Sequence, residues 1–308
     1  MLVTICIPIC FELPFLEGSL RQIQKYKHPD IDHEILIMNQ TEQKWHKKIN
    51  DLAQEYDAKV IDIPRIDAGY PIDVASRIAN GEYFCTLDAD AFPISFNWLN
   101  LPIQLIKKFG FSFIGKESGL HHAYKNSLGN YFHLNNYYRV SKTSTAKFLS
   151  EKIGFIRQQN KSRAELRYEI NDVNVSCDNG VLAQWLSDKE NLGPKLSLKM
   201  DKIIGKTPNM GVYGMVIDDL VFHMVFGQTN EEYGYLNQEY QELSNRIYSE
   251  GLTEEIINLL LSKAKIENII NLYGFENLSI NGRQYYDNDN HRFLSDDDEI
   301  TKFIESML

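Results

Sequence analysis

The stretch Gly81–Pro93, GEYFCTLDADAFP, decides the fold of this chain. It begins at a turn residue, continues as an apolar run and ends on Asp88 and Asp90. A continuous apolar run is typical of a strand buried on both faces of a sheet, and ligands of open α/β sheets bind where such strands end. On a continuing strand, side chains two residues apart point the same way. Two carboxylates flanking the small Ala89 therefore predict a site for a hard divalent cation that also binds phosphate oxygens.

The residues before this stretch alternate between strand and helix patterns. β-branched and apolar runs predict strands over 3–8, 33–38 and 59–63. Apolar residues at helical spacing predict helices over 14–26 and 43–56, and a third helix that contains Ile72, Ala75 and Ile78. This β-α-β-α-β-α-β order predicts a mostly parallel central sheet flanked by helices, with right-handed crossovers. An isolated Asp-x-Asp is more often a solvated turn, and the alternation is what favours a ligand site here.

Beyond residue 100 the pattern is less regular. A strand is expected over 111–115, followed by a polar loop over 116–136 of the kind that covers sites. Asp178 precedes a helix pattern, and an alternating apolar run over 210–225 contains His223. From residue 231 onward we expect acidic helices. The predicted organisation is a domain over 1–230, divided into halves 1–100 and 101–230, with a helical C-terminal extension over 231–308.

Composition restricts the classes of partner. The 308 residues are 43% hydrophobic, which is ample for a core, and the net charge of −10 argues against a nucleic-acid surface. No apolar run approaches the length of a membrane span. The four cysteines include no CxxC pair and two of them lie in strand-like runs, which indicates reduced core thiols. We therefore expect a cytoplasmic protein with no nucleic-acid partner and no transmembrane segment.

Four segments carry a resemblance to a known family. VTICIPIC (3–10), FLEGSLRQIQKY (15–26), EILIMNQ (34–40) and GYPIDVASRIANGEYFCTLDADAF (69–92) resemble the GT-A fold of nucleotide-sugar glycosyltransferases, most of all the family 2 type. In that family a small-residue helix leads into a strand ending in the Asp-x-Asp (DXD) motif. The resemblance covers about residues 1–100, weakens over 170–226 and is absent beyond. It implies a Rossmann-like GT-A fold.

The resemblance also implies a metal site and a nucleotide site. Asp88 and Asp90, with Ala89 between them, would hold Mn²⁺ or Mg²⁺ against the diphosphate of a nucleotide-sugar, where the metal acts as a Lewis acid. His223 is the candidate for a further metal ligand, and a packed core histidine is the alternative. Pro8 and Cys10 would lie beside the nucleoside.

The segment that should contact the base departs from the family pattern. Family 2 enzymes usually carry an acidic residue after the second strand, where this chain has Asn39 and Gln40. An amide side chain offers both a donor and an acceptor to a base edge. Uracil, and so UDP, is expected, and guanine stays open. Asp62, or Pro64 with Arg65, is a further candidate for the nucleoside.

Catalysis by inversion needs a carboxylate that accepts the proton of the attacking hydroxyl. Asp178 occupies the region where the family places that base, and Asp218 and Asp219 are its rivals. The predicted reaction is hexosyl transfer to a saccharide or another hydroxyl acceptor. Lys116 or Arg139 is a candidate for phosphate, although a role as an ordinary polar loop residue explains each of them better when taken singly.

Two other functions stay open at this point. A nucleotidyltransferase would need a glycine-rich basic loop after the first strand, and the segment 10–14, CFELP, is neither. A GT-A-like protein that binds nucleotide without transfer is the non-enzymatic alternative. The C-terminal helices would complete the acceptor site, form a homodimer contact or cover the edge of the sheet, and the sequence does not choose among these roles.

Overall fold

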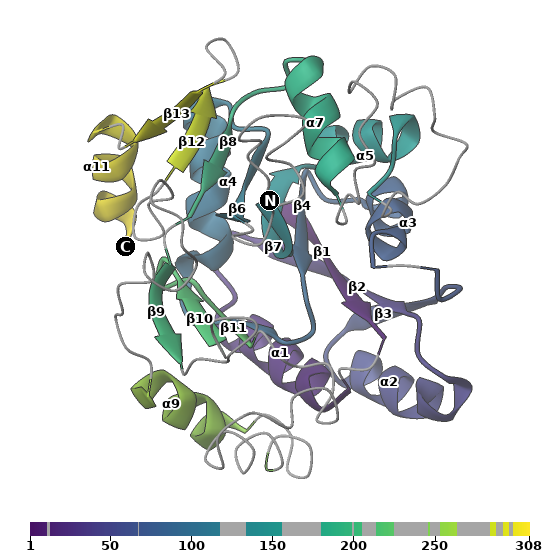
Figure 1. Ribbon diagram of the computed structural model, residues 1–308. Coiled ribbons are helices and arrows are strands. Elements are labelled where there is room, and N and C mark those ends of the chain that lie inside the picture. Colours follow the sequence, from purple (N-terminus) through teal and green to yellow (C-terminus); the bar gives the residue numbers. More distant parts are fainter. Residues whose placement is uncertain are drawn as a thin grey trace.

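The computed structural model describes residues 1–10, 13–66, 68–117, 134–155, 180–198, 200–204, 214–224, 246, 253–263, 284–287, 292–295 and 298–308. A nine-stranded sheet has the order β13-β12-β8-β6-β7-β4-β1-β2-β3, and a smaller sheet has the order β5-β11-β10-β9 (Figure 1). The strands of the large sheet are β1 (Leu2–Ile9), β2 (Asp32–Asn39), β3 (Ala58–Asp62), β4 (Tyr83–Leu87), β6 (Phe113–Glu117), β7 (Leu134–Lys142), β8 (Lys195–Ser197), β12 (Gln284–Asp287) and β13 (Arg292–Ser295). The small sheet contains β5 (Ala91–Pro93), β9 (Met200–Ile204), β10 (Gly214–Ile217) and β11 (Val221–Met224).

Within the large sheet only β7 and β12 run against the other described strands. The pairs β1–β2, β2–β3 and β1–β4 are parallel, as the alternating pattern predicts. The order β4-β1-β2-β3 places a topological switch point between β1 and β4, where ligands of doubly wound sheets bind. The α/β class with a mostly parallel central sheet is thus confirmed.

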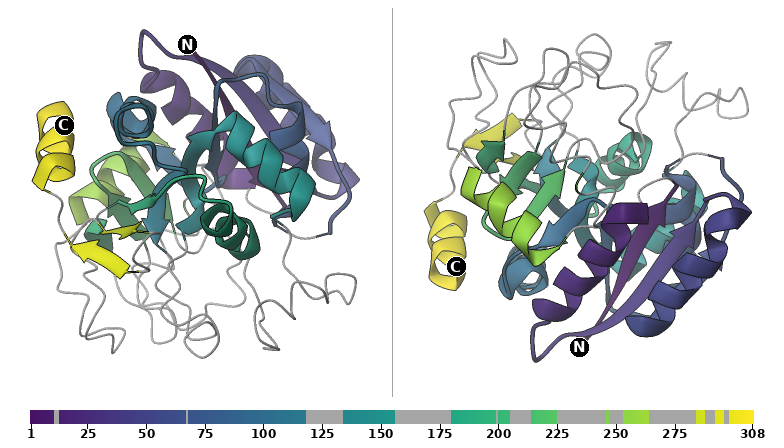
Figure 2. Two further views of the ribbon diagram at one scale, coloured as in Figure 1. Left: turned by 90° about the horizontal axis from the view of Figure 1, so that it is seen from above. Right: turned by 90° about the horizontal axis from the view of Figure 1, so that it is seen from below.

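Helices cover both faces of this sheet, as the turned views show (Figure 2). The described helices are α1 (Leu13–Lys25), α2 (Gln43–Glu55), α3 (Tyr70–Ile78), α4 (Asn97–Phe109), α5 (Thr143–Lys152), α7 (Val181–Lys189), α9 (Glu254–Lys263) and α11 (Asp298–Met307). Residues of α1, α2 and α4 share one core with the odd-numbered residues of β1 and β4, while α3 and α5 share the other with Cys6 and Phe84. No described helix is long and apolar enough to cross a membrane.

A close backbone approach joins the start of β4 to β1. A Cβ atom at Gly81 would lie 2.5 Å from the backbone nitrogen of Thr4, so this position accepts only glycine. The Gly81 N–H donates to Thr4 Oγ1 (2.9 Å), and that hydroxyl donates to Glu34 Oε2 (2.6 Å). The turn residue that opens GEYFCTLDADAFP therefore sets β4 directly beside β1.

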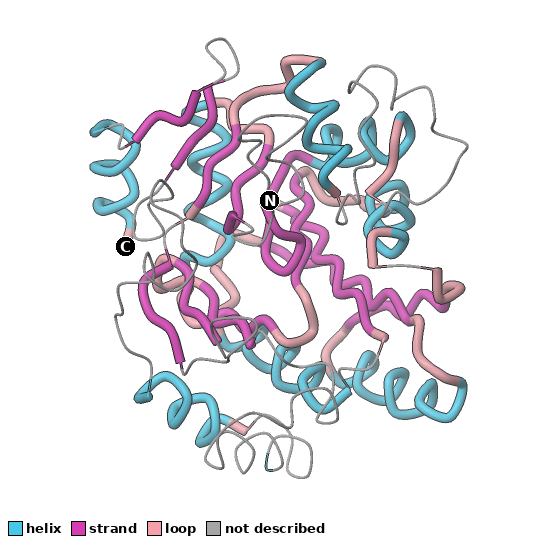
Figure 3. The backbone as a smooth tube through the Cα atoms, viewed as in Figure 1, coloured by secondary structure: helices cyan, strands magenta, loops and turns pink. Residues whose placement is uncertain are grey.

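The C-terminal region is not helical throughout. α9 and α11 are helices as expected, but β12 and β13 extend the large sheet beyond β8: β12 pairs antiparallel with β8, and β13 pairs antiparallel with β12 (Figure 3). The sequence predicts helix from residue 231 onward and does not predict the short strands that contain Tyr285 and Phe293. The division of the chain at residue 230 stays a prediction.

Candidate metal centre

A turn after β4 brings the two carboxylates together. The sequence places both carboxylates where the strand gives out. β4 ends at Leu87, one residue before Asp88, so the same-side geometry of a continuing strand does not apply. The Asp88 carbonyl accepts the Ala91 N–H (2.9 Å), which closes a tight turn around Ala89 and Asp90. The chain then enters β5, which pairs with β11 and sets Ala91 opposite His223.

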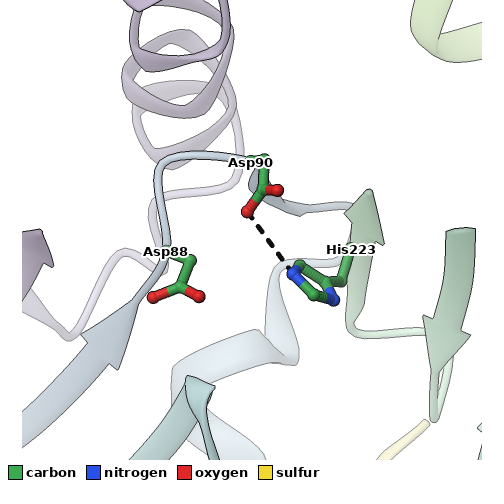
Figure 4. Close-up of side chains that lie close together, drawn as sticks. All are labelled: Asp88, Asp90 and His223. Carbon is green, nitrogen blue, oxygen red and sulfur yellow. Dashed lines mark ion pairs between the residues drawn. The ribbon is translucent and has the colours of Figure 1, made fainter. Parts of the chain in front are cut away.

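The three predicted metal ligands converge. One ligand atom each from Asp88, Asp90 and His223 lie within 4.8 Å of one another. His223 Nε2 is 3.4 Å from Asp90 Oδ1, and the histidine projects from β11 toward the Asp88–Asp90 turn (Figure 4). Asp90 and His223 are 6% and 7% exposed, and Asp88 is half-buried. Residues 133 positions apart in the sequence thus form one cluster at the carboxyl end of β4.

Tyr137 completes this cluster, and the sequence analysis missed it. Its ring stacks on the His223 ring with centroids 4.1 Å apart and planes 11° apart. Its backbone carbonyl accepts the Asp88 N–H (2.9 Å), which extends the β4–β7 pairing by one residue. The only signal in the sequence was the resumption of an apolar pattern near residue 138, which does not identify a stacking partner.

The donor set suits a divalent cation. Two carboxylates and an imidazole are ligands that Mn²⁺ accepts, and carboxylates alone are the preference of Mg²⁺. His223 Nδ1 is buried and has no hydrogen-bond partner. Metal-ligating histidines usually donate this second N–H to an acceptor that fixes the ring, and here the Tyr137 stack orients it instead. The residues present therefore fit Mn²⁺ or Mg²⁺.

The predicted nucleoside residues lie at the same edge of the sheet. Pro8 and Cys10 stand at the end of β1, and both are half-buried. Gln40 follows β2 and donates through Nε2 to the Pro64 carbonyl (2.9 Å). Arg65 is exposed in the segment after β3. The carboxyl ends of β1 to β4 thus carry the side chains expected to meet the nucleoside and the metal, while the phosphate candidates Lys116 and Arg139 lie on β6 and β7.

Asn39 is engaged within the protein. It is 1% exposed, its Nδ2 donates to Asp62 Oδ1 (2.6 Å), and its Oδ1 accepts from the N–H and hydroxyl of Thr41 (3.0 and 2.7 Å). The Asp62 side chain is 57% exposed, and its other oxygen lies 3.7 Å from His46 Nδ1. The group presented at this edge is therefore the Asp62 carboxylate, which Asn39 orients.

The structure describes two of the three candidate catalytic bases. Asp178 lies outside the described residues, and the chain is described again from Gly180, whose N–H donates to the Phe155 carbonyl (2.8 Å). Asp218 and Asp219 form the hairpin turn between β10 and β11, with φ angles of 46° and 50°. The Leu220 N–H donates to the Ile217 carbonyl (2.8 Å), as in a type I′ turn. The structure thus places both rivals in this turn, and a catalytic or metal-binding role for either stays a prediction.

Several solved structures are similar to part of this chain. A mannosyltransferase from Pyrobaculum calidifontis in complex with GDP-Man and Mn²⁺ is 15% identical with a TM-score of 0.40, over 50% of this chain and 47% of that one. S. aureus TarS 1–349 with UDP-GlcNAc is 16% identical with a TM-score of 0.38, over 51% and 49%. Glucosyl-3-phosphoglycerate synthase from Mycobacterium tuberculosis, solved with Mn²⁺ and UDP, is 11% identical with a TM-score of 0.37, over 47% and 57%.

The matches include GT-A glycosyltransferases, and the chain spans about half the length of each of these structures. At these identities and TM-scores the likeness is one of architecture and assigns no residue a role. No protein-family model matches the sequence. No curated protein matches it either.

Proposed function

We propose that this protein is a metal-dependent glycosyltransferase of the hexosyltransferase type. It would transfer a sugar from a nucleotide diphosphate-sugar, with UDP as the expected nucleotide, to a hydroxyl of a saccharide or another acceptor. One observation carries the proposal: Asp88, Asp90 and His223 converge at the carboxyl end of β4. That place is the switch point of the doubly wound sheet, where phosphate-bearing ligands bind.

The ligand residues differ in burial, and this suggests a division of roles. Asp90 and His223 are nearly buried, so the negative charge of the Asp90 carboxylate is poorly screened and attracts a cation strongly, while His223 offers a ring nitrogen beside it. Asp88 is the more exposed carboxylate, which suits the side facing a diphosphate. A Mn²⁺ or Mg²⁺ ion bound there would supply Lewis-acid stabilisation of the departing nucleoside diphosphate.

The nucleoside would lie across the ends of β1, β2 and β3. We expect Asp62, oriented by Asn39, to accept a hydrogen bond from an imide or amide N–H of the base, which both uracil and guanine offer. Pro8 and Cys10 would contact the nucleoside at the end of β1. This arrangement would move the base-reading carboxylate from the second strand to the third.

The proposed catalytic base is Asp178, with inversion at the anomeric carbon. An Asp178→Asn variant should lose transfer while keeping its affinity for the nucleotide and metal, because the amide cannot accept the acceptor proton. Steady-state turnover compared with calorimetric Kd values measures this. Weakened nucleotide binding with unchanged turnover would assign Asp178 to the donor site instead.

Calorimetric titration with UDP and GDP, each with and without Mn²⁺, tests the proposal. One nucleotide should bind the wild type only with metal, and Asp88→Asn/Asp90→Asn should lose that binding. Asp30→Asn/Asp51→Asn makes the same charge change at two exposed positions and should bind like the wild type. If neither nucleotide binds with metal present, the glycosyltransferase proposal fails.

Turnover separates a transferase from a protein that only binds nucleotide. The wild type should slowly hydrolyse a diphosphate-sugar of the nucleotide that binds, since water can replace the acceptor. Release of the nucleoside diphosphate, measured by a coupled assay, should depend on Mn²⁺ and vanish in the double variant. Metal-dependent binding without release, across a panel of donors and acceptors, would support the non-enzymatic alternative.

A further inference from the structure

Arg139 is a buried cation in β7 whose charge is not compensated. It is 2% exposed, and its guanidinium carbon lies 5.0 Å from the Phe113 ring centroid and 4.8 Å from that of Phe155. Its Nη1 is buried without a hydrogen-bond partner, and no carboxylate among the described residues forms an ion pair with it. Burial lowers the pKa of Arg139 to about 9. A cation in this state is costly unless something pairs with it.

Arg139 lies close to the end of β4, beyond which Asp88 follows. Arg139 pairs with Thr86, and Asp88 comes two residues later in the chain, where its N–H donates to the Tyr137 carbonyl (2.9 Å). The Cys6 thiol on β1 interacts with the charges of both Asp88 and Arg139. The pKa of Cys6 is raised by burial, then by Cys85 and Asp88, and is lowered by Arg139. Two residues along a strand span about 7 Å, which is comparable to one hexose ring.

The neighbouring strand leaves Arg139 without a facing side chain on one side. Its partner in β6 is Gly115, where a Cβ atom would lie 2.6 Å from the Tyr138 carbonyl oxygen and 3.4 Å from Arg139 Cβ. Only glycine allows this approach of β6 to β7. Among the described residues, the guanidinium is surrounded by two phenyl rings, the backbone of β6 and the thiols of Cys6 and Cys85, and none of these accepts a hydrogen bond from Nη1.

We propose that Arg139 binds an oxyanion carried by the substrate, one sugar ring away from the metal centre. The proposal rests on the proposed function, which places the donor diphosphate at Asp88 and Asp90. Phenyl rings stabilise a guanidinium through cation–π contacts and leave its N–H edges for a bidentate contact with a carboxylate or phosphoryl group. The oxyanion has two sources: the carboxylate of a hexuronate on the donor, or a phosphoryl group on the acceptor.

Two matched pairs of ligands distinguish these sources. UDP-glucuronate and UDP-glucose differ only at C6 and are titrated calorimetrically with Mn²⁺ present. Glucose 6-phosphate and glucose differ only in the phosphoryl group and are titrated with and without UDP and Mn²⁺. We expect the wild type to prefer the charged member of one pair by about tenfold to a hundredfold, as charge-assisted hydrogen bonds do.

Variants at Arg139 test whether that preference comes from the guanidinium. Arg139→Met should abolish the preference and keep the affinity for UDP with Mn²⁺, since Asp88 and Asp90 are unchanged. Its Tm should equal or exceed that of the wild type, because a buried unpaired cation has been removed. Arg139→Lys keeps the charge without the planar fork and should retain only part of the preference.

The outcomes separate this proposal from the proposed function. If the wild type binds UDP with Mn²⁺ but discriminates in neither pair, the Arg139 site is wrong and the metal site stands. Discrimination that survives in Arg139→Met also overturns it. If UDP does not bind at all, the proposed function fails, and the acceptor pair still reports on Arg139. Should Arg139→Met not fold, undiminished preference in Arg139→Lys overturns the site.

Discussion

Tyr137 contacts the candidate metal centre through two different groups, its ring and its backbone carbonyl. We expect Tyr137→Leu to weaken Mn²⁺ binding about tenfold, as loss of an orienting partner of a metal ligand usually does. Tyr137→Phe keeps the ring and should bind Mn²⁺ like the wild type. Titration followed by electron paramagnetic resonance measures the free ion, and matched Tm values exclude a general loss of structure. Unchanged affinity in the Leu variant would show that the stack does not position His223.

His33 makes the stability of the protein sensitive to acid. Both ring nitrogens are buried without hydrogen-bond partners, and the ring stands edge-on to Trp98 at 6.1 Å. Burial, then the Lys27 charge, lowers the pKa of His33 to about 4 from 6.5. The unfolded chain therefore binds the proton first, so the stability that neutral His33 provides above pH 6.5 is lost as pH falls toward about 4.

The expected loss from His33 is about 2 kcal/mol between pH 7 and pH 5. His33→Phe should remove this part of the pH dependence, because a phenyl ring does not titrate. The free energy of unfolding from urea titrations at the two pH values measures it, and His28→Gln is a control at a histidine outside the core. An equally steep pH dependence in His33→Phe would assign the acid sensitivity to other groups.

At the scale of elements, the β10–β11 hairpin places His223. Its turn contains Asp219 at φ 50°, a conformation that glycine adopts without strain. Asp219→Gly should therefore raise the free energy of unfolding by about 0.5–1 kcal/mol and leave binding of nucleotide and Mn²⁺ unchanged. Asp57→Gly, at another positive φ of 51°, is the matched control and should gain similarly.

The same variant tests the rival role of Asp219. If the Asp219 carboxylate acts in catalysis or binds the metal, its replacement by glycine should lower turnover or the affinity for Mn²⁺, independently of the change in stability. Calorimetry and the nucleotide-release assay on one preparation separate the two effects. Loss of Mn²⁺ binding or of nucleotide release in Asp219→Gly, with Asp57→Gly unaffected, would support a catalytic or metal-binding role for Asp219.

Also at this scale, local patterns explain which elements were predictable. Runs such as Val3–Pro8 and the apolar spacing of Leu16, Leu20 and Ile23 decide their own secondary structure, because burial of a continuous run or of one helical face dominates. The short strands β12 and β13 have four residues each and are held by their neighbour β8. Such strands carry too little local signal to be distinguished from helix.

At the scale of the whole molecule, α11 is part of the main fold. Ile304 is fully buried against α4, the Phe303 ring meets Phe109 edge-on at 5.8 Å, and Asn97 Nδ2 donates to the Met307 carbonyl (2.6 Å). Ile304→Ala should cost about 2–4 kcal/mol of stability through the lost contacts and the cavity. Urea unfolding measures this cost.

Glu305→Ala, at the next and exposed position of α11, is the control and should change stability little. A negligible cost for Ile304→Ala would mean that α11 is an appended segment rather than part of the core. A homodimer through the C-terminal helices stays a prediction. Sedimentation of the wild type and of Ile304→Ala would show the oligomeric state of each protein, and so whether a dimer depends on the packing of α11.

The sequence by itself determined the elements of the first hundred residues, their alternation, and the candidate ligands Asp88 and Asp90. These follow from local patterns of burial and from the position of polar residues at strand ends. His223 became a candidate only through the resemblance to GT-A glycosyltransferases. It did not determine that Asp88 and Asp90 meet through a turn, that Tyr137 stacks on His223, or that Asn39 turns toward Asp62. Those contacts join residues far apart in the chain or depend on where a strand stops. The pairing of β5 with β11, of β4 with β7 and of β2 with β3 decided them, because strand register fixes which side chains share a face.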